Sequence, residues 1–161
     1  MSERAAAGTV PVLKDVIVDC VDPERLAAFW SELLDRPVAG WTGPYVWLAR
    51  GGGPGLGFQR VAQPKAGKNR VHFDLASADP DAVRARVEAL GGRRLDRYAD
   101  GGFLVLADPE GNEFCVIPPG PFEVDDDGRT DYLGEGRTDQ PGGGRTDYPG
   151  YGQGVPRGKA V

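Results

Sequence analysis

The chain has 161 residues, of which 25 are glycine and 14 are proline, and its formal net charge is −5. This acidic balance argues against a nucleic-acid partner, and no apolar run approaches the ~20 residues of a membrane span. One histidine, His72, excludes a site with several histidines from this chain, and two cysteines are too few for a disulfide framework. The N-terminus lacks the apolar core of a secretory signal, so we expect a cytoplasmic protein that contacts no membrane.

The first 62 residues predict a strand, a helix and three more strands. We expect residues 1–11 to be flexible and residues 14–20, which alternate and are rich in β-branched side chains, to form a strand. Asp22 suits the cap of a helix that begins with Pro23. The apolar stripe of this helix has the spacing of Leu26, Phe29, Trp30 and Leu33. Short strands divided by glycine and proline are expected at about 37–41, 45–50 and 56–61.

Residues 69–118 repeat this order. A strand is expected at 70–76, and Asp79 and Pro80 open a helix that ends at Gly91. The apolar face of this second helix consists of Val83, Val87 and Leu90. Three strands follow near 93–98, 103–107 and 113–117, with a turn at residues 108–112.

The two halves are in close register. Asp22 and Asp79 are 57 residues apart, and so are Asp15 and His72 on the strands before them. Gln59 and Cys115 also correspond, at 44 and 43 residues after Asp15 and His72. A repeated supersecondary unit decides the fold before any other signal. The sequence therefore predicts an α+β domain of two βαβββ modules, at residues 12–62 and 69–118.

Strand alternation assigns the side chains to two faces. The apolar face, which should pack under the helices, consists of Val16, Val18, Phe58, Val71, Phe73, Leu75, Phe114 and Val116. The opposite face consists of Asp15, Ile17, Asp19, Gln59, His72, Asp74, Cys115 and Ile117. This second face is too polar to be a core, so we expect it to line a cleft or to face solvent.

Residues 119–161 have the composition of a disordered tail. Fourteen of the 39 glycine and proline residues fall between 121 and 161, and GRTD occurs at 128–131, 136–139 and 144–147. A segment with so few apolar residues cannot offset the entropy cost of ordering. Two interpretations stay open: a repeat tract without a role, or a weak multivalent segment that binds partners.

The paired modules, together with NRVHFDL at 69–75 and DPEGNEFCVI at 108–117, resemble the vicinal oxygen chelate superfamily and its glyoxalase-like and bleomycin-resistance-like members. The resemblance covers about residues 12–118. It implies the glyoxalase/bleomycin resistance/dihydroxybiphenyl dioxygenase fold, in which two modules form a curved eight-stranded mixed sheet around a cleft. It also implies a homodimer.

The same resemblance places metal ligands on the first and last strand of each module. The corresponding residues are Asp15, Gln59, His72 and Cys115. Glyoxalases use His, Glu and Gln with nickel or zinc, and ring-cleaving dioxygenases use two histidines and a carboxylate with iron. Because this chain departs from both sets, we expect a pocket without a cofactor. The alternative is a divalent ion, zinc or nickel, held by these four residues.

Catalytic and binding roles can also be assigned. His72 can act as a general base with Asp15 or Asp74 orienting its ring, and Cys115 as a nucleophile. The alternative for Cys115 is inert packing. Trp47 is expected in a pocket or an interface. We expect the ligand-binding residues to be Asp15, Trp47, Gln59, His72, Asp74 and Cys115.

Three functions follow from these observations. The first is a glyoxalase-like protein that binds a small organic molecule in its cleft, with or without catalysis. The second is a metal-assisted lyase or isomerase of the glyoxalase type. The third is a scaffold protein that acts through its repeat tail.

Overall fold

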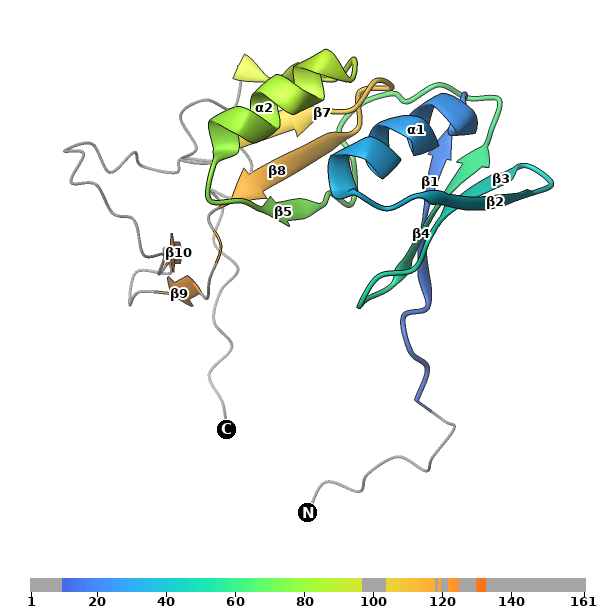
Figure 1. Cartoon of the computed structure of the whole chain (residues 1–161), viewed down its shortest axis with the longest axis horizontal. Helices are drawn as coiled ribbons and strands as arrows, with labels where there is room; N and C mark the ends of the chain where they lie inside the picture. The colour runs from blue at the N-terminus through green and yellow to red at the C-terminus, as the bar shows by residue number, and fades with distance from the viewer. Residues whose placement is uncertain (1–9, 97–103, 118, 120–121, 125–129, 133–161) are drawn as a thin grey trace, which may run out of the picture. The chain divides into compact units, whose positions relative to one another are not determined.

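The repeat in the sequence is also a repeat of secondary structure (Figure 1). The structure, a computed structural model, describes residues 10–96, 104–117, 119, 122–124 and 130–132. It divides into two units, Met1–Gly67 with Asp108–Gly111 and Lys68–Ala107 with Asn112–Val161. We call these the first and the second module. Each contains a strand, a helix and three further strands, which confirms the predicted α+β fold.

The first module is a four-stranded mixed sheet with one helix. Its elements are β1 (Asp15–Cys20), α1 (Pro23–Leu34), β2 (Val38–Thr42), β3 (Tyr45–Leu48) and β4 (Gly55–Arg60). The strands lie in the order β1-β4-β3-β2, with β1 parallel to β4 and the other pairs antiparallel. The side chain of Asp22 caps α1 by accepting a hydrogen bond from the Arg25 N–H at 3.1 Å, as predicted.

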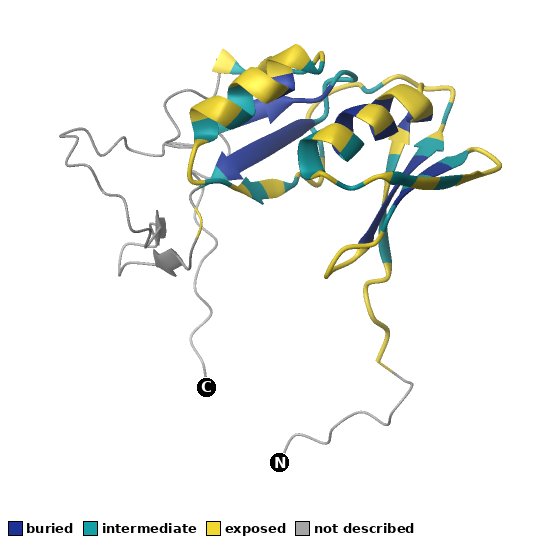
Figure 2. Cartoon of the chain, viewed as in Figure 1, coloured by how far each residue is buried: buried dark blue, intermediate teal, exposed yellow. Residues whose placement is uncertain are grey.

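The core of the first module lies between α1 and the sheet. Figure 2 shows exposed and buried residues alternating around α1, as expected of an amphipathic helix. The largest buried side chains come from α1, β3 and β4: Leu26, Phe29, Trp30, Val46, Leu48 and Phe58. These residues hold α1 against one face of the sheet. The other face carries polar side chains.

A turn from the second half of the sequence completes the first module. The Asp108 side chain is fully buried, and its Oδ2 accepts a hydrogen bond from Trp30 Nε1 at 3.3 Å. The Glu110 carboxylate accepts hydrogen bonds from the backbone N–H groups of Val21 and Asp22 at 2.9 and 2.7 Å. Gly111 closes the turn with φ 90°, a conformation that glycine adopts without strain. The DPEG turn therefore braces the N-terminus of α1.

The second module has the same topology. Its elements are β5 (Asp74–Ala76), α2 (Pro80–Ala89), β6 (Arg93–Arg94), β7 (Leu104–Ala107) and β8 (Glu113–Ile117). The strand order is β5-β8-β7-β6, with β5 parallel to β8. Asp79 caps α2 by accepting a hydrogen bond from the Ala82 N–H at 2.9 Å. The eight main strands are thus divided into two four-stranded sheets, one in each module.

The strand predicted at 70–76 is shorter in the structure. It begins only at Asp74, and Val71, which we expected in the core, is 71% exposed. The preceding segment is held by other bonds: the Asn69 N–H donates to the buried Glu113 carboxylate at 3.1 Å. Alternation is a guide to burial only where a strand is paired, and the Asp74–Cys115 pair is the first in the register.

The structure describes only parts of two further segments, residues 93–98 and residues 119–161. Of the strand predicted at 93–98, only Arg93–Arg94 is a strand, and residues 97–98 lie outside the described residues. In the segment expected to be disordered, β9 (Phe122–Val124) pairs antiparallel with β10 (Thr130–Tyr132). This pairing includes part of the first GRTD copy, whereas the other two copies lie outside the described residues.

Neither described helix has the length and apolar character to cross a membrane.

Candidate functional site

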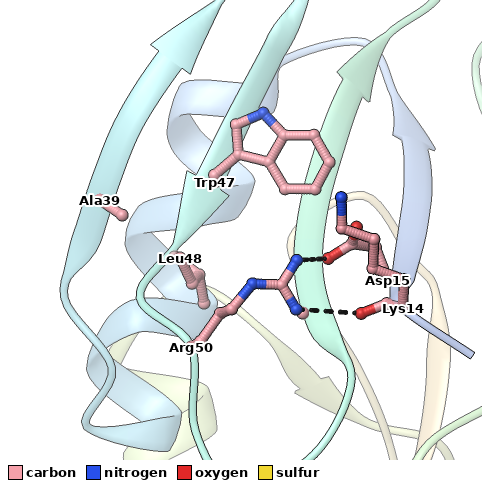
Figure 3. Close-up of a pocket in the computed structure, with 7 residues that line it drawn as sticks. Lys14, Asp15, Ala39, Trp47, Leu48 and Arg50 are labelled. Carbon is pink, nitrogen blue, oxygen red and sulfur yellow. Dashed lines mark hydrogen bonds and ion pairs between the residues drawn. The ribbon is translucent and has the colours of Figure 1, made fainter.

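The first module contains a pocket on the polar face of its sheet (Figure 3). Its volume is about 340 Å³, at the lower end of the usual range for small-molecule sites. Residues at or beside β1, β2 and β3, in the loop after β3 and at the start of β4 line it: Lys14, Asp15, Ala39, Trp47, Leu48, Arg50 and Gly55. Asp15 and Trp47 were expected at a binding site, whereas Lys14 and Arg50 were not.

An ion pair lies at one end of this pocket. Arg50 Nη2 donates to Asp15 Oδ1 at 2.5 Å, and Arg50 Nη1 donates to the Lys14 carbonyl at 3.1 Å. The Asp15 side chain is only 18% exposed, and Arg50 is its ion-pair partner. The Asp15 carboxylate, which the family resemblance implied as a metal ligand, is therefore already paired with Arg50.

Two glycines of β4 make room for these side chains. A Cβ on Gly55 would lie 2.1 Å from Asp15 Oδ1, and a Cβ on Gly57 would lie 2.8 Å from the Trp47 ring. Both distances are too short for a real contact. The absence of side chains at alternate positions of β4 therefore creates the surface on which Trp47 and Asp15 lie.

Trp47 forms the aromatic wall of the pocket. Its ring stacks on Tyr45, with centroids 5.8 Å apart and an interplanar angle of 23°. Tyr45 and Trp47 are two residues apart on β3 and therefore share a face. Trp41, on β2, is 66% exposed and is not among the lining residues.

Gln59 and Cys20 do not line this pocket. The strand register pairs Gln59 with Asp19, whereas Gly57 pairs with Ile17. Cys20 is buried, and burial, with the carboxylates of Glu110 and Asp108, raises the pKa of its thiol to about 12. Cys20 is therefore a protonated packing residue at neutral pH.

The second module brings together three of the predicted residues. The potential ligand atoms of His72, Asp74 and Cys115 all lie within 4.8 Å of one another. Asp74 and Cys115 are register partners on β5 and β8, and His72 precedes Asp74 by two residues. His72 Nε2 lies 3.3 Å from Asp74 Oδ1, and both side chains are about half exposed, whereas Cys115 is buried.

The predicted residues are thus divided between the modules. Asp15, Trp47 and Gln59 belong to the first module, and His72, Asp74 and Cys115 to the second. A single site made from all of them remains a prediction. Sequence reasoning missed Lys14, Arg50 and the two β4 glycines. The signal for the glycines was their spacing of two within a strand, which places both on one face.

The comparison with protein families agrees with the fold. The glyoxalase-like domain family matches residues 15–117. The match covers most of the chain and includes residues of both modules. This protein therefore belongs to the glyoxalase-like domain family, in agreement with the resemblance to glyoxalase-like members of the vicinal oxygen chelate superfamily.

Two curated relatives share a shorter segment. The protein named "Putative glyoxylase CFP32" from Mycobacterium bovis is 40% identical over 57 residues, which are 33% of this chain and 22% of that protein. The Mycobacterium tuberculosis protein of the same name gives the same values. The match thus spans about a fifth of the length of these relatives.

Solved structures share the fold at low identity. A glyoxalase-related enzyme from Fulvimarina pelagi has a TM-score of 0.54 at 16% identity, covering 76% of this chain and 99% of that one. The fosfomycin resistance protein FosX from Mesorhizobium loti gives 0.54 at 15%, covering 68% and 93%. The trypanothione-dependent glyoxalase I from Leishmania major gives 0.53 at 16%, covering 68% and 87%.

Proposed function

We propose that this protein binds a small organic molecule in the pocket of its first module. The observation that carries the proposal is the combination of Trp47 as an aromatic wall with Lys14, Asp15 and Arg50 at the same pocket. A concave apolar surface with a few converging polar groups is typical of ligand sites. The proposal does not require catalysis.

The parts of this pocket have distinct roles in binding. Trp47 and Ala39 offer the apolar surface that a ligand body covers. The Arg50 guanidinium is fixed by Asp15 and by the Lys14 carbonyl. A group held in this way loses little freedom when it bonds a ligand. The pocket is therefore preorganised at its polar end.

Ligand-observed NMR with a fragment library tests the proposal on the full chain. We expect a subset of fragments to bind wild type and to lose binding in Trp47→Leu. Trp41→Leu is the matched control because Trp41 is exposed and outside the pocket. A library that yields no fragment sensitive to Trp47→Leu would show that the pocket does not bind small molecules.

A second candidate function is supported by the His72–Asp74–Cys115 cluster: metal-assisted lyase or isomerase chemistry. A thiolate, an imidazole and a carboxylate are donors that suit zinc, so the residues of the second module fit a borderline divalent ion. Asp15, bound to Arg50, does not fit as a free ligand. A divalent ion would polarise an oxygen of a bound substrate.

The three residues have separable tasks in this second candidate. Asp74 lies within bonding distance of His72 Nε2 and orients the ring, so Nδ1 is the other nitrogen available. Cys115 supplies a sulfur next to an exposed imidazole. Without a metal, the same arrangement supports the alternative in which His72 is a general base and Cys115 a nucleophile.

Metal analysis of untagged protein separates these candidates. Stoichiometric zinc or nickel, lost in both His72→Ala and Cys115→Ser together with fragment binding, would replace the metal-free proposal by the second candidate. Asp96→Asn is the control, since Asp96 is exposed and pairs with Arg94. Fragment binding without metal, retained in both variants, would leave the metal-assisted function without support.

Three expectations from the sequence stay proposals beside these two. Family resemblance supports a homodimer, which light scattering on the purified chain tests. A cytoplasmic location is tested by fractionation of cells that make the protein. The scaffold function of the repeat tail is tested by comparing partner capture by the full chain and by a chain that ends at Gly120.

A further inference from the structure

We propose that the pocket of the first module selects a planar organic anion: a carboxylate attached to an aromatic or conjugated body. This inference rests on the proposed function, because it names the class of molecule that the same pocket takes. Three observations carry it: the balance of charge, the donors of Arg50 and the surface around Trp47.

The charge at the pocket is positive. Lys14, Asp15 and Arg50 are its ionisable lining residues, two cations and one anion. Asp15 is taken by Arg50, so the pair is internally compensated. Among the described residues, the Lys14 ammonium has no ion-pair partner. An anionic ligand would therefore be attracted by one uncompensated cation, the Lys14 ammonium. A cationic ligand would find no uncompensated carboxylate in the pocket lining.

Arg50 keeps donors that a carboxylate can use. A guanidinium carries five N–H groups in a rigid plane, and the two bonds to Asp15 and to the Lys14 carbonyl hold that plane in position. Such a plane suits a carboxylate, which can accept two of its N–H bonds side by side. Figure 3 shows Trp47, Arg50 and the Lys14 ammonium around the same opening.

The body of the ligand is set by Trp47 and the glycines. The ring lies against β4 where Gly57 has no side chain, and Tyr45 stacks on it. Aromatic faces prefer offset-stacked or edge contacts with other rings. A volume of about 340 Å³ accommodates a small ring system. The apolar wall and the cationic end together fit an arene carboxylate.

Three related probes test this inference by calorimetry on the full chain. They are 2-naphthoate, the neutral 2-naphthamide with the same rings, and cyclohexanecarboxylate, an anion without a planar body. We expect 2-naphthoate to bind at least about tenfold more tightly than either other probe, which corresponds to ~1.4 kcal/mol. Its affinity should fall as salt is raised, because the cations are partly exposed.

Variants identify the cations involved. Lys14→Gln and Arg50→Gln should each weaken 2-naphthoate binding about three- to tenfold and weaken 2-naphthamide binding by a smaller factor, as expected for charge-assisted bonds. Lys65→Gln is the matched control, since Lys65 belongs to the same module, donates to the Gly67 carbonyl and does not line the pocket. It should leave both affinities unchanged.

The outcomes separate this inference from the proposed function. Equal binding of 2-naphthoate and 2-naphthamide overturns the anion preference but leaves small-molecule binding intact. Equal binding of 2-naphthoate and cyclohexanecarboxylate overturns the planar preference alone. If none of the probes binds while the library yields fragments sensitive to Trp47→Leu, the inference fails and the proposed function stands. If the library also yields none, both fail.

Discussion

The two modules have one topology but different chemistry on their polar faces. In each, the first strand pairs in parallel with the last, and a capped helix covers the other face. The first module holds an ion pair beside a pocket, whereas the second holds a cluster of His72, Asp74 and Cys115. The strand register gives the reason: Ile17 pairs with Gly57 in the first module, and Asp74 pairs with Cys115 in the second.

This comparison changes one correspondence that the sequence suggested. Spacing matched Gln59 with Cys115, but the register makes Gly57 the equivalent of Cys115, because Ile17 and Asp74 are 57 residues apart. A glycine offers no ligand atom, and Trp47 lies where its side chain would be. A change at a single strand position can thus turn a potential ligand position into the floor of a pocket.

The largest effect is expected from the turn that braces α1. Asp108→Ala removes the acceptor of the Trp30 N–H and of the Glu110 N–H in a buried place. We expect a loss of about 2–4 kcal/mol in the free energy of unfolding, measured by urea denaturation. Asp81→Ala, at an exposed residue of α2, should cost below ~0.5 kcal/mol. Equal losses would mean that Asp108 does not brace the first module.

The two cysteines offer a direct comparison of the modules. Cys20 is 1% exposed and the pKa of its thiol is raised to about 12, so little thiolate exists at pH 8. Cys115 is 7% exposed and lies beside an exposed imidazole. We expect iodoacetamide to modify Cys115 at least about tenfold faster than Cys20, because the thiolate is the reacting form. Peptide mass spectrometry measures both rates, and faster labelling of Cys20 would contradict the contrast.

The β4 glycine can be tested by adding one methyl group. Gly57→Ala places a Cβ 2.8 Å from the Trp47 ring and should displace it. We expect fragment binding in the first module to weaken about tenfold, or ~1.4 kcal/mol, while the His72–Asp74–Cys115 cluster is unaffected. Gly40→Ala is the control, since nothing lies within 4 Å of a Cβ there. Unchanged binding in Gly57→Ala would separate Trp47 from ligand binding.

A smaller effect of opposite sign is expected at Asp15. Asp15→Asn removes the only anion among the lining residues and keeps an oxygen that Arg50 can bond. We expect 2-naphthoate to bind about threefold more tightly, because one repulsive charge is lost near the surface. Asp19→Asn, four residues along β1 and outside the pocket lining, serves as the control. Weaker binding in Asp15→Asn would show that the Asp15 charge is needed to hold Arg50.

The smallest effect is expected from removal of the tail. A chain that ends at Gly120 should keep its Tm within ~2 °C and its fragment affinities within twofold, because both helices and both four-stranded sheets lie before residue 118. Differential scanning fluorimetry and the NMR library provide the measurements. A large fall in Tm would show that residues 121–161 stabilise a module.

Much of the fold could be predicted from local signals. The caps Asp22 and Asp79, the apolar stripe of α1 and the strand at 113–117 all appear in the structure where the sequence placed them. These signals are local, since a cap or a stripe depends on residues three or four positions apart. The strand at 70–76 was predicted too long because pairing, and not alternation, decides where a strand begins.

The candidate sites were predictable only in part. The sequence nominated Asp15, Trp47, His72, Asp74 and Cys115, but it could not tell that Asp15 binds Arg50, which is 35 residues away. The sequence predicted residues 108–112 only as a turn between two strands of the second half. In the structure, Asp108 and Glu110 accept hydrogen bonds from α1 and from the residues just before it. Contacts between residues this far apart in the sequence depend on how the strands pair, and strand pairing leaves no local pattern in the sequence.

The sequence by itself determined the repeat, the family resemblance and the absence of a site with several histidines. Those results follow from residue identity and spacing, which do not depend on packing. Only the tertiary structure decided that Arg50 neutralises Asp15, that Gly55 and Gly57 leave room for a pocket and that Asp74 joins His72 and Cys115. The physical reason is that charge compensation, close approach and ligand geometry are properties of atoms within a few ångströms, and chain distance does not fix them.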